Sequence, residues 1–101
     1  MVALNTNSDT PQPRFPLGQI VATPGAWTAM EEADQHPGQL LLRHRSGDWG
    51  EVDAGDARAN DDAVAVGERI LSAYTLGTGV KIWIITESDR SVTTFLLPDE
   101  Y

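Results

Sequence analysis

The chain has 101 residues, the usual length of one domain, and its 15 acidic and 7 basic side chains give a net charge of −8. It has no cysteine, which excludes disulfides, thiolate metal sites and cysteine nucleophiles. The longest apolar runs, such as residues 82–85, are far shorter than the ~20 residues of a membrane helix. The N-terminal residues have neither the basic nor the apolar region of a signal peptide, so we expect a cytoplasmic protein.

The excess of acidic side chains limits the possible partners. Binding to nucleic-acid phosphates requires clusters of basic residues, and the only close basic pair is Arg43 and Arg45. We therefore expect no direct binding to nucleic acid and, for the same reason, none to anionic membranes. A partner protein with a basic surface is favoured, although many domains are acidic only because charge keeps them soluble.

The first part of the chain predicts a tail, a strand and a helix. Residues 1–14 lack any apolar period and predict a flexible N-terminal tail, so that residues 15–101 form the single domain. Residues 18–23 have the composition of a strand. Thr23 and Pro24 then predict a helix start, with Thr23 as N-cap, and the helix should run to about residue 34. Its buried stripe is predicted to contain Ala26, Met30 and Ala33, with Trp27 beside them.

Two further helices are predicted before residue 68. The first spans about residues 37–45 and points Leu40 and Leu41 inward, with His44 as a further candidate for burial. A loop with two glycines follows at residues 47–53. Asp53 is the predicted N-cap of the next helix and Gly67 its C-terminal stop. That helix is expected to turn three apolar residues inward, namely Ala59, Ala63 and Val66.

The last third predicts three strands joined by short turns. Residues 68–76, 80–87 and 91–97 are rich in β-branched and aromatic side chains, and their connections have hairpin length. The predicted order is therefore β-α-α-α-β-β-β. It indicates an α+β fold with an antiparallel sheet of about four strands and helices packed on one face.

No pattern in the sequence indicates catalysis or metal binding. His36 and His44 are eight residues apart on either side of Pro37, so they do not form the i, i+4 pair of a zinc helix. No serine lies in a G-x-S-x-G motif, and the acidic pairs lie in polar segments. We therefore expect no catalytic residues, no cofactor and no metal. One alternative remains open, an enzyme or small-ligand binder with a pocket near His44, Asp48 and Trp49.

The most acidic segment is the best candidate for a protein-binding site. Residues 48–62 contain six acidic residues and one basic residue, Arg58, although the carboxylates do not form one row on a helical projection. Trp49, between two glycines, could anchor an interface or fold back to close the core. The hypothesis of a protein-interaction site comprises Asp48, Trp49, Glu51, Asp53, Asp56, Asp61 and Asp62. A second alternative is a structural module that self-associates through a sheet edge or an exposed apolar face. The sequence leaves the oligomeric state open.

Three segments carry a resemblance to a known family: FPLGQIVATPGA (15–26), RHRSGDWG (43–50) and ERILSAYTLGTGVKIWIITESDRSVTTFLLPDEY (68–101). They resemble small bacterial proteins, carried on plasmids and other mobile elements, for which no activity is established. The resemblance implies an accessory protein of mobile DNA, a setting shared with small acidic anti-restriction and anti-CRISPR proteins. We therefore expect a non-enzymatic protein that binds and inhibits a nucleic-acid-handling system, in the manner of a DNA mimic.

Overall fold

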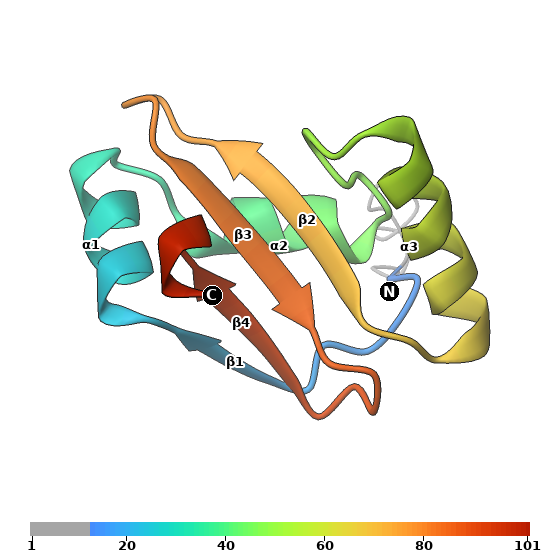
Figure 1. Cartoon of the computed structure of the whole chain (residues 1–101). Coiled ribbons are helices and arrows are strands. Elements are labelled where there is room, and N and C mark those ends of the chain that lie inside the picture. The colour runs from blue at the N-terminus through green and yellow to red at the C-terminus, as the bar shows by residue number, and fades with distance from the viewer. Residues whose placement is uncertain (1–12) are drawn as a thin grey trace, which may run out of the picture.

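A computed structural model describes residues 13–101. Most of the predicted tail, residues 1–12, lies outside the described residues. The chain forms an α+β fold in the predicted order, as Figure 1 shows. Its elements are β1 (Gln19–Ala22), α1 (Pro24–Glu32), α2 (Pro37–Arg45), α3 (Ala54–Val66), β2 (Ile70–Thr75), β3 (Lys81–Thr86), β4 (Val92–Leu96) and the 3-10 helix η2 (Pro98–Glu100).

The sheet is mixed, so the prediction of an antiparallel sheet was wrong for one of its three strand pairs. The strand order is β1-β4-β3-β2. The pairs β2–β3 and β3–β4 are antiparallel, but β1 runs parallel to β4, with Gln19 opposite Val92 and Ala22 opposite Phe95. The reason is the chain path: three helices carry the chain from β1 to the far edge of the sheet. The meander then returns strand by strand until β4 lies beside β1 in the same direction.

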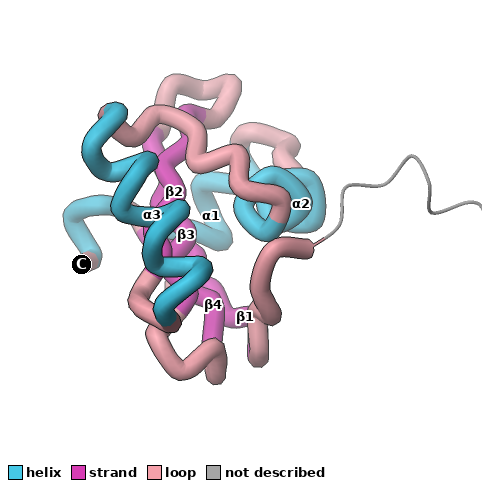
Figure 2. The backbone as a smooth tube through the Cα atoms, turned by 90° about the vertical axis from the view of Figure 1, so that its right-hand side faces the viewer, coloured by secondary structure: helices cyan, strands magenta, loops and turns pink. Residues whose placement is uncertain are grey.

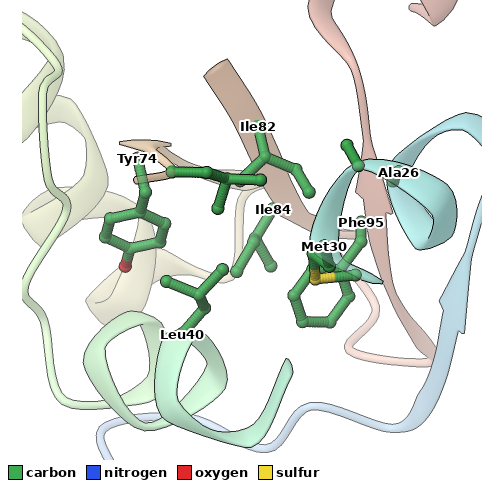
Figure 3. Close-up of a cluster of buried hydrophobic side chains, with 9 residues drawn as sticks. Ala26, Met30, Leu40, Tyr74, Ile82, Ile84 and Phe95 are labelled. Carbon is green, nitrogen blue, oxygen red and sulfur yellow. The ribbon is translucent and has the colours of Figure 1, made fainter. Parts of the chain in front are cut away.

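The main core lies between one face of the sheet and the helices α1 and α2. Figures 1 and 2 show α2 on this face and η2 on the opposite side of the sheet. The core consists of side chains from both helices and from β2–β4, most of which are labelled in Figure 3: Ala26, Ala29, Met30, Leu40, Tyr74, Leu76, Ile82, Ile84 and Phe95. The alternation of a strand places these sheet residues on one side. A smaller cluster, of Phe15, Trp49, Ala63 and Ile70, lies beside α3.

Local capping chemistry fixes the helix ends where the sequence predicted them. The Thr23 hydroxyl accepts a hydrogen bond from the Ala26 N–H (3.1 Å) and starts α1. The Asp53 carboxylate accepts one from the Asp56 N–H (2.7 Å) and starts α3. Gly67 ends α3 with φ of 78°, a backbone angle that glycine adopts without steric cost.

The predicted inner face of α3 was wrong in two of its three residues. Ala63 is buried, but Ala59 and Val66 are exposed, and Asn60 is buried in their place. Trp27, expected beside the buried stripe of α1, is 50% exposed. On α3 the physical reason is that the helix contacts the outer edge of β2, where unpaired backbone groups require a polar side chain.

Asn60 and the loop before α3 together close the outer edge of β2. The Asn60 amide donates to the Leu71 carbonyl (2.8 Å) and accepts from the Leu71 N–H (3.1 Å), so it takes the place of a neighbouring strand. Two residues further along, the Ala73 N–H donates to the Trp49 carbonyl (3.1 Å) and its carbonyl accepts from the Glu51 N–H (2.7 Å). The backbone of both Leu71 and Ala73 is therefore satisfied on this side.

The bonds of Asn60 predict a large effect of an apolar substitution. In Asn60→Leu the Leu71 N–H and carbonyl lose both partners, and we expect the free energy of unfolding to fall by about 3 kcal/mol. Urea unfolding followed by tryptophan fluorescence measures this change. The control Ala59→Leu, on an exposed neighbour, should change it by less than about 0.5 kcal/mol. Equal stability of the Asn60→Leu variant and the unmodified chain would contradict the role assigned to Asn60.

Candidate functional site

The loop that contains Trp49 runs along β2. The Asp48 carbonyl accepts a hydrogen bond from the Tyr74 hydroxyl (2.6 Å), and Gly50 forms a parallel bridge with Ala73. Gly50 has φ of 75°, and a Cβ atom there would collide with the Ala73 carbonyl oxygen. The glycine is therefore required for the close approach that holds the loop on the strand.

Trp49 closes the smaller core cluster. Its side chain is 6% exposed and lies against Phe15 and His44, with ring centroids 6.1 Å away in each case. Its indole N–H donates to the Asp61 carboxylate (3.1 Å). Of the two roles that the sequence left open, Trp49 thus takes the structural one, and its ring is not displayed to a partner.

Five of the six acidic residues of segment 48–62 divide into two groups. Asp48 pairs with Arg43 (2.7 Å) and Asp61 with Arg14 (3.2 Å). The hydrogen bond from Arg43 lowers the pKa of Asp48, and those from the Trp49 indole and then Arg14 lower the pKa of Asp61. These two carboxylates are therefore partly neutralised by arginines of the same fold. Arg43 and Asp48 are five residues apart and meet at the turn that ends α2, whereas Arg14 and Asp61 are 47 residues apart and are brought together only by the tertiary structure.

Three other carboxylates of the segment border one groove, and one of them, Glu51, lies 3.9 Å from the Lys81 Nζ. Glu51, Asp53 and Asp56 surround a hollow of about 370 Å³ on the sheet face opposite α2. We call it the acidic groove. Its remaining lining residues are Val52, Leu71, Ala73, Lys81, Trp83 and Pro98. Asp62 is exposed but does not line this groove.

The floor of the acidic groove was missed in the sequence-based site. Leu71 and Ala73 occupy the face of β2 opposite to Tyr74, and Trp83 lies directly across from Ala73 on β3. The Trp83 ring makes an edge contact with Tyr101, at a centroid distance of 5.8 Å. The alternation of apolar residues along β2 and β3 was a usable signal for this second apolar face. Such a floor suits the hydrocarbon stem of a lysine or arginine, whose charged end would meet the carboxylates and the aromatic ring.

His44, the centre of the alternative ligand pocket, is fully buried in a chain of hydroxyl groups. Its Nδ1 is 2.6 Å from the Ser72 hydroxyl and its Nε2 is 2.9 Å from the Thr86 hydroxyl. Thr86 is in turn 2.7 Å from the Thr93 hydroxyl, which donates to the Leu17 carbonyl (2.7 Å). With 0% exposure and both ring nitrogens occupied, His44 is closed to a ligand.

The order of donors in this chain defines the protonation of His44. Thr93 uses its only hydroxyl proton on the Leu17 carbonyl, so Thr86 must donate to Thr93. Thr86 then accepts from His44, which places the proton on Nε2 and leaves Nδ1 to accept from Ser72. The ring is neutral in this arrangement. Burial lowers the pKa of His44 from 6.5 to about 4.

Within residues 13–101 no group of three or more His, Asp or Glu side chains has an arrangement that could hold a metal ion. Over the same residues, no helix combines the length and apolar character needed to cross a membrane. Comparison with known protein families, with curated proteins and with solved structures gives no match for this chain.

The buried neutral state of His44 predicts acid sensitivity. Above pH 6.5 the ring is neutral in both folded and unfolded chains; below it, only the unfolded chain takes up a proton until about pH 4. We therefore expect this group alone to remove about 2 kcal/mol of stability between pH 6.5 and 5. Urea unfolding at several pH values measures the slope.

Two controls separate His44 from the carboxylates. His44→Gln should flatten the slope between pH 6.5 and 5, whatever its effect on absolute stability. His36→Asn, which replaces an exposed cap residue by another good cap, should leave the contribution of His44 in place. NMR titration of the His44 ring gives a direct reading, and an apparent pKa near 6.5 in the folded chain would contradict this account.

Proposed function

We propose that this chain is a non-enzymatic protein that binds a basic segment of a partner protein in the acidic groove. The observation that carries the proposal is that Glu51, Asp53 and Asp56 border one groove whose floor contains a half-buried aromatic side chain, that of Trp83. Carboxylates that steer and orient a cation, above an apolar floor that its stem can cover, provide complementary recognition of lysine and arginine. The net charge of −8 adds long-range attraction for a basic partner.

The partner class in this proposal is a cytoplasmic protein that handles nucleic acid. Such proteins display clusters of lysine and arginine that neutralise phosphates, and a carboxylate-lined groove seated on such a cluster would compete with nucleic acid. The resemblance to proteins of mobile elements supports this class, because inhibition of a host restriction or CRISPR system would favour the element. In this proposal DNA mimicry is limited to the charges of one groove, since Asp48 and Asp61 are paired with arginines.

A variant of the groove tests the proposal. Glu51→Gln, Asp53→Asn and Asp56→Asn together remove three charges, while asparagine at position 53 still caps α3. The immobilised chain captures proteins from its bacterial host at low salt, and mass spectrometry identifies them. We expect proteins with basic surfaces, and we expect the triple variant to bind a purified captured protein roughly tenfold more weakly.

The matched control removes three carboxylates away from the groove: Glu32→Gln, Glu68→Gln and Glu87→Gln. It has the same net charge as the groove variant and should keep most of the affinity. If both variants weaken binding equally, overall charge rather than the groove governs the interaction, and the proposal fails. It also fails if added double-stranded DNA leaves the captured complexes intact, since competition for a nucleic-acid-binding surface requires displacement.

A further inference from the structure

The two edges of the sheet differ in the state of their backbone groups. The outer edge of β2 is closed by Asn60 and by the bridge at Gly50. At the other edge, β1 pairs with β4 alone, and all four of its residues are exposed. Figure 1 shows β1 at this margin of the sheet. The described part of the chain thus has one covered sheet edge and one open edge.

The open edge presents the backbone groups of Ile20 and Ala22. The Gln19 N–H donates to the carbonyl of Ser91, the residue before β4 (2.9 Å), and the Thr23 N–H donates to the carbonyl of Phe95 in β4 (3.0 Å). In a parallel ladder, successive residues of an edge strand direct their N–H and carbonyl groups alternately toward the neighbouring strand and away from it. The N–H and carbonyl groups of Ile20 and Ala22 therefore point away from β4, where an added strand would hydrogen-bond to them. The four residues of β1 carry no charge that would repel such a strand.

An apolar pocket lies directly beside this edge. Its volume is about 310 Å³, and its lining includes Ile20, Ala22, Trp27, Met30, Pro37 and Phe95. Ile20 is 42% and Trp27 50% exposed, so large apolar side chains are displayed at the point where the backbone is open. A strand laid along β1 would place an alternate side chain over this pocket.

The pocket continues into an acidic hollow. Trp27, Met30 and Pro37 also line a second hollow, of about 390 Å³, whose rim carries Glu31 and Asp34. A segment that fills the apolar pocket can therefore reach two carboxylates with a cationic side chain. A second copy of this chain fits less well, because each copy carries a net charge of −8 and would bring the same two carboxylates to the contact.

We propose that β1 takes up an extended segment of a partner protein as an additional strand of the sheet, with an apolar side chain in the pocket and a cationic one beside Glu31 and Asp34. This surface is separate from the acidic groove, which adjoins β2 and β3 at the other edge. Either surface can fail its test without affecting the other.

The test uses a defined probe, a capped peptide of about eight residues with threonine at every second position and valine and lysine in turn at the positions between, titrated into the full chain. Valine and lysine then lie on one face of the added strand, toward the pocket and the two carboxylates. NMR hydrogen exchange reports on strand addition, because the amides of Ile20 and Ala22 should exchange at least about tenfold more slowly once they are bonded. Trp27→Ala, which removes a wall of the pocket, should abolish most of the binding. A peptide with glutamate in place of lysine should bind much more weakly.

Charge variants separate this edge from the acidic groove. Glu31→Gln with Asp34→Asn should weaken binding of the lysine peptide roughly fivefold; asparagine tolerates the positive φ of 53° at position 34. The protection of Ile20 and Ala22 by the peptide should persist in the triple groove variant described above.

Three outcomes would overturn the proposal. The first is binding without protection of these two amides. The second is equal binding of the lysine and glutamate peptides. The third is a dimer in sedimentation whose Ile20 and Ala22 amides are already protected without peptide, which would make a second copy the occupant.

Discussion

The His44 ring on α2 is hydrogen-bonded to Ser72 on β2 and Thr86 on β3, and the chain of bonds continues through Thr93 on β4 to the Leu17 carbonyl before β1. The uncharged His44 side chain thus connects α2 directly with β2 and β3, and through the Thr86 hydroxyl with β4. These hydroxyls lie on a face that is otherwise apolar. A shift of one residue in β2 or β3 would leave His44 with an unsatisfied nitrogen, and a shift in β4 would leave the Thr86 hydroxyl without its acceptor. The chain of bonds therefore favours one strand register over its neighbours, at the cost of requiring a neutral ring.

A fixed register in turn decides which surfaces remain for partners. The helices α1 and α2 cover the face that carries the hydroxyls, and Asn60 and the Trp49 loop close the edge at β2. What remains open is the opposite face, with Trp83, and the edge at β1. Both proposed binding surfaces follow from this division. They lie at different edges of one rigid sheet, so occupation of one does not sterically exclude the other.

The sequence predicted those features that depend on a few neighbouring residues. Thr23 with Pro24, Asp53 and Gly67 act through their own backbone, and so the helix bounds agree closely with the structure. The parallel pairing of β1 with β4 joins residues more than seventy positions apart, and no local pattern encodes it. The burial of Asn60 shows the same limit, because its partner, the open backbone of Leu71, exists only after β2 has reached α3.

The sequence identifies residues 48–62 as the most acidic segment but does not indicate which of its carboxylates share a surface. The sequence treats residues 48–62 as one acidic segment, yet folding assigns Asp48 and Asp61 to arginines that support the loop and directs Glu51, Asp53 and Asp56 to the groove. Counting carboxylates therefore overstates the charge that is displayed to a partner. Three carboxylates over a tryptophan can recognise a cationic side chain by shape as well as charge, whereas an even distribution of acidic residues could not select a partner. In the proposed function, the selectivity of this surface depends on Leu71, Ala73 and Trp83 as much as on its acids.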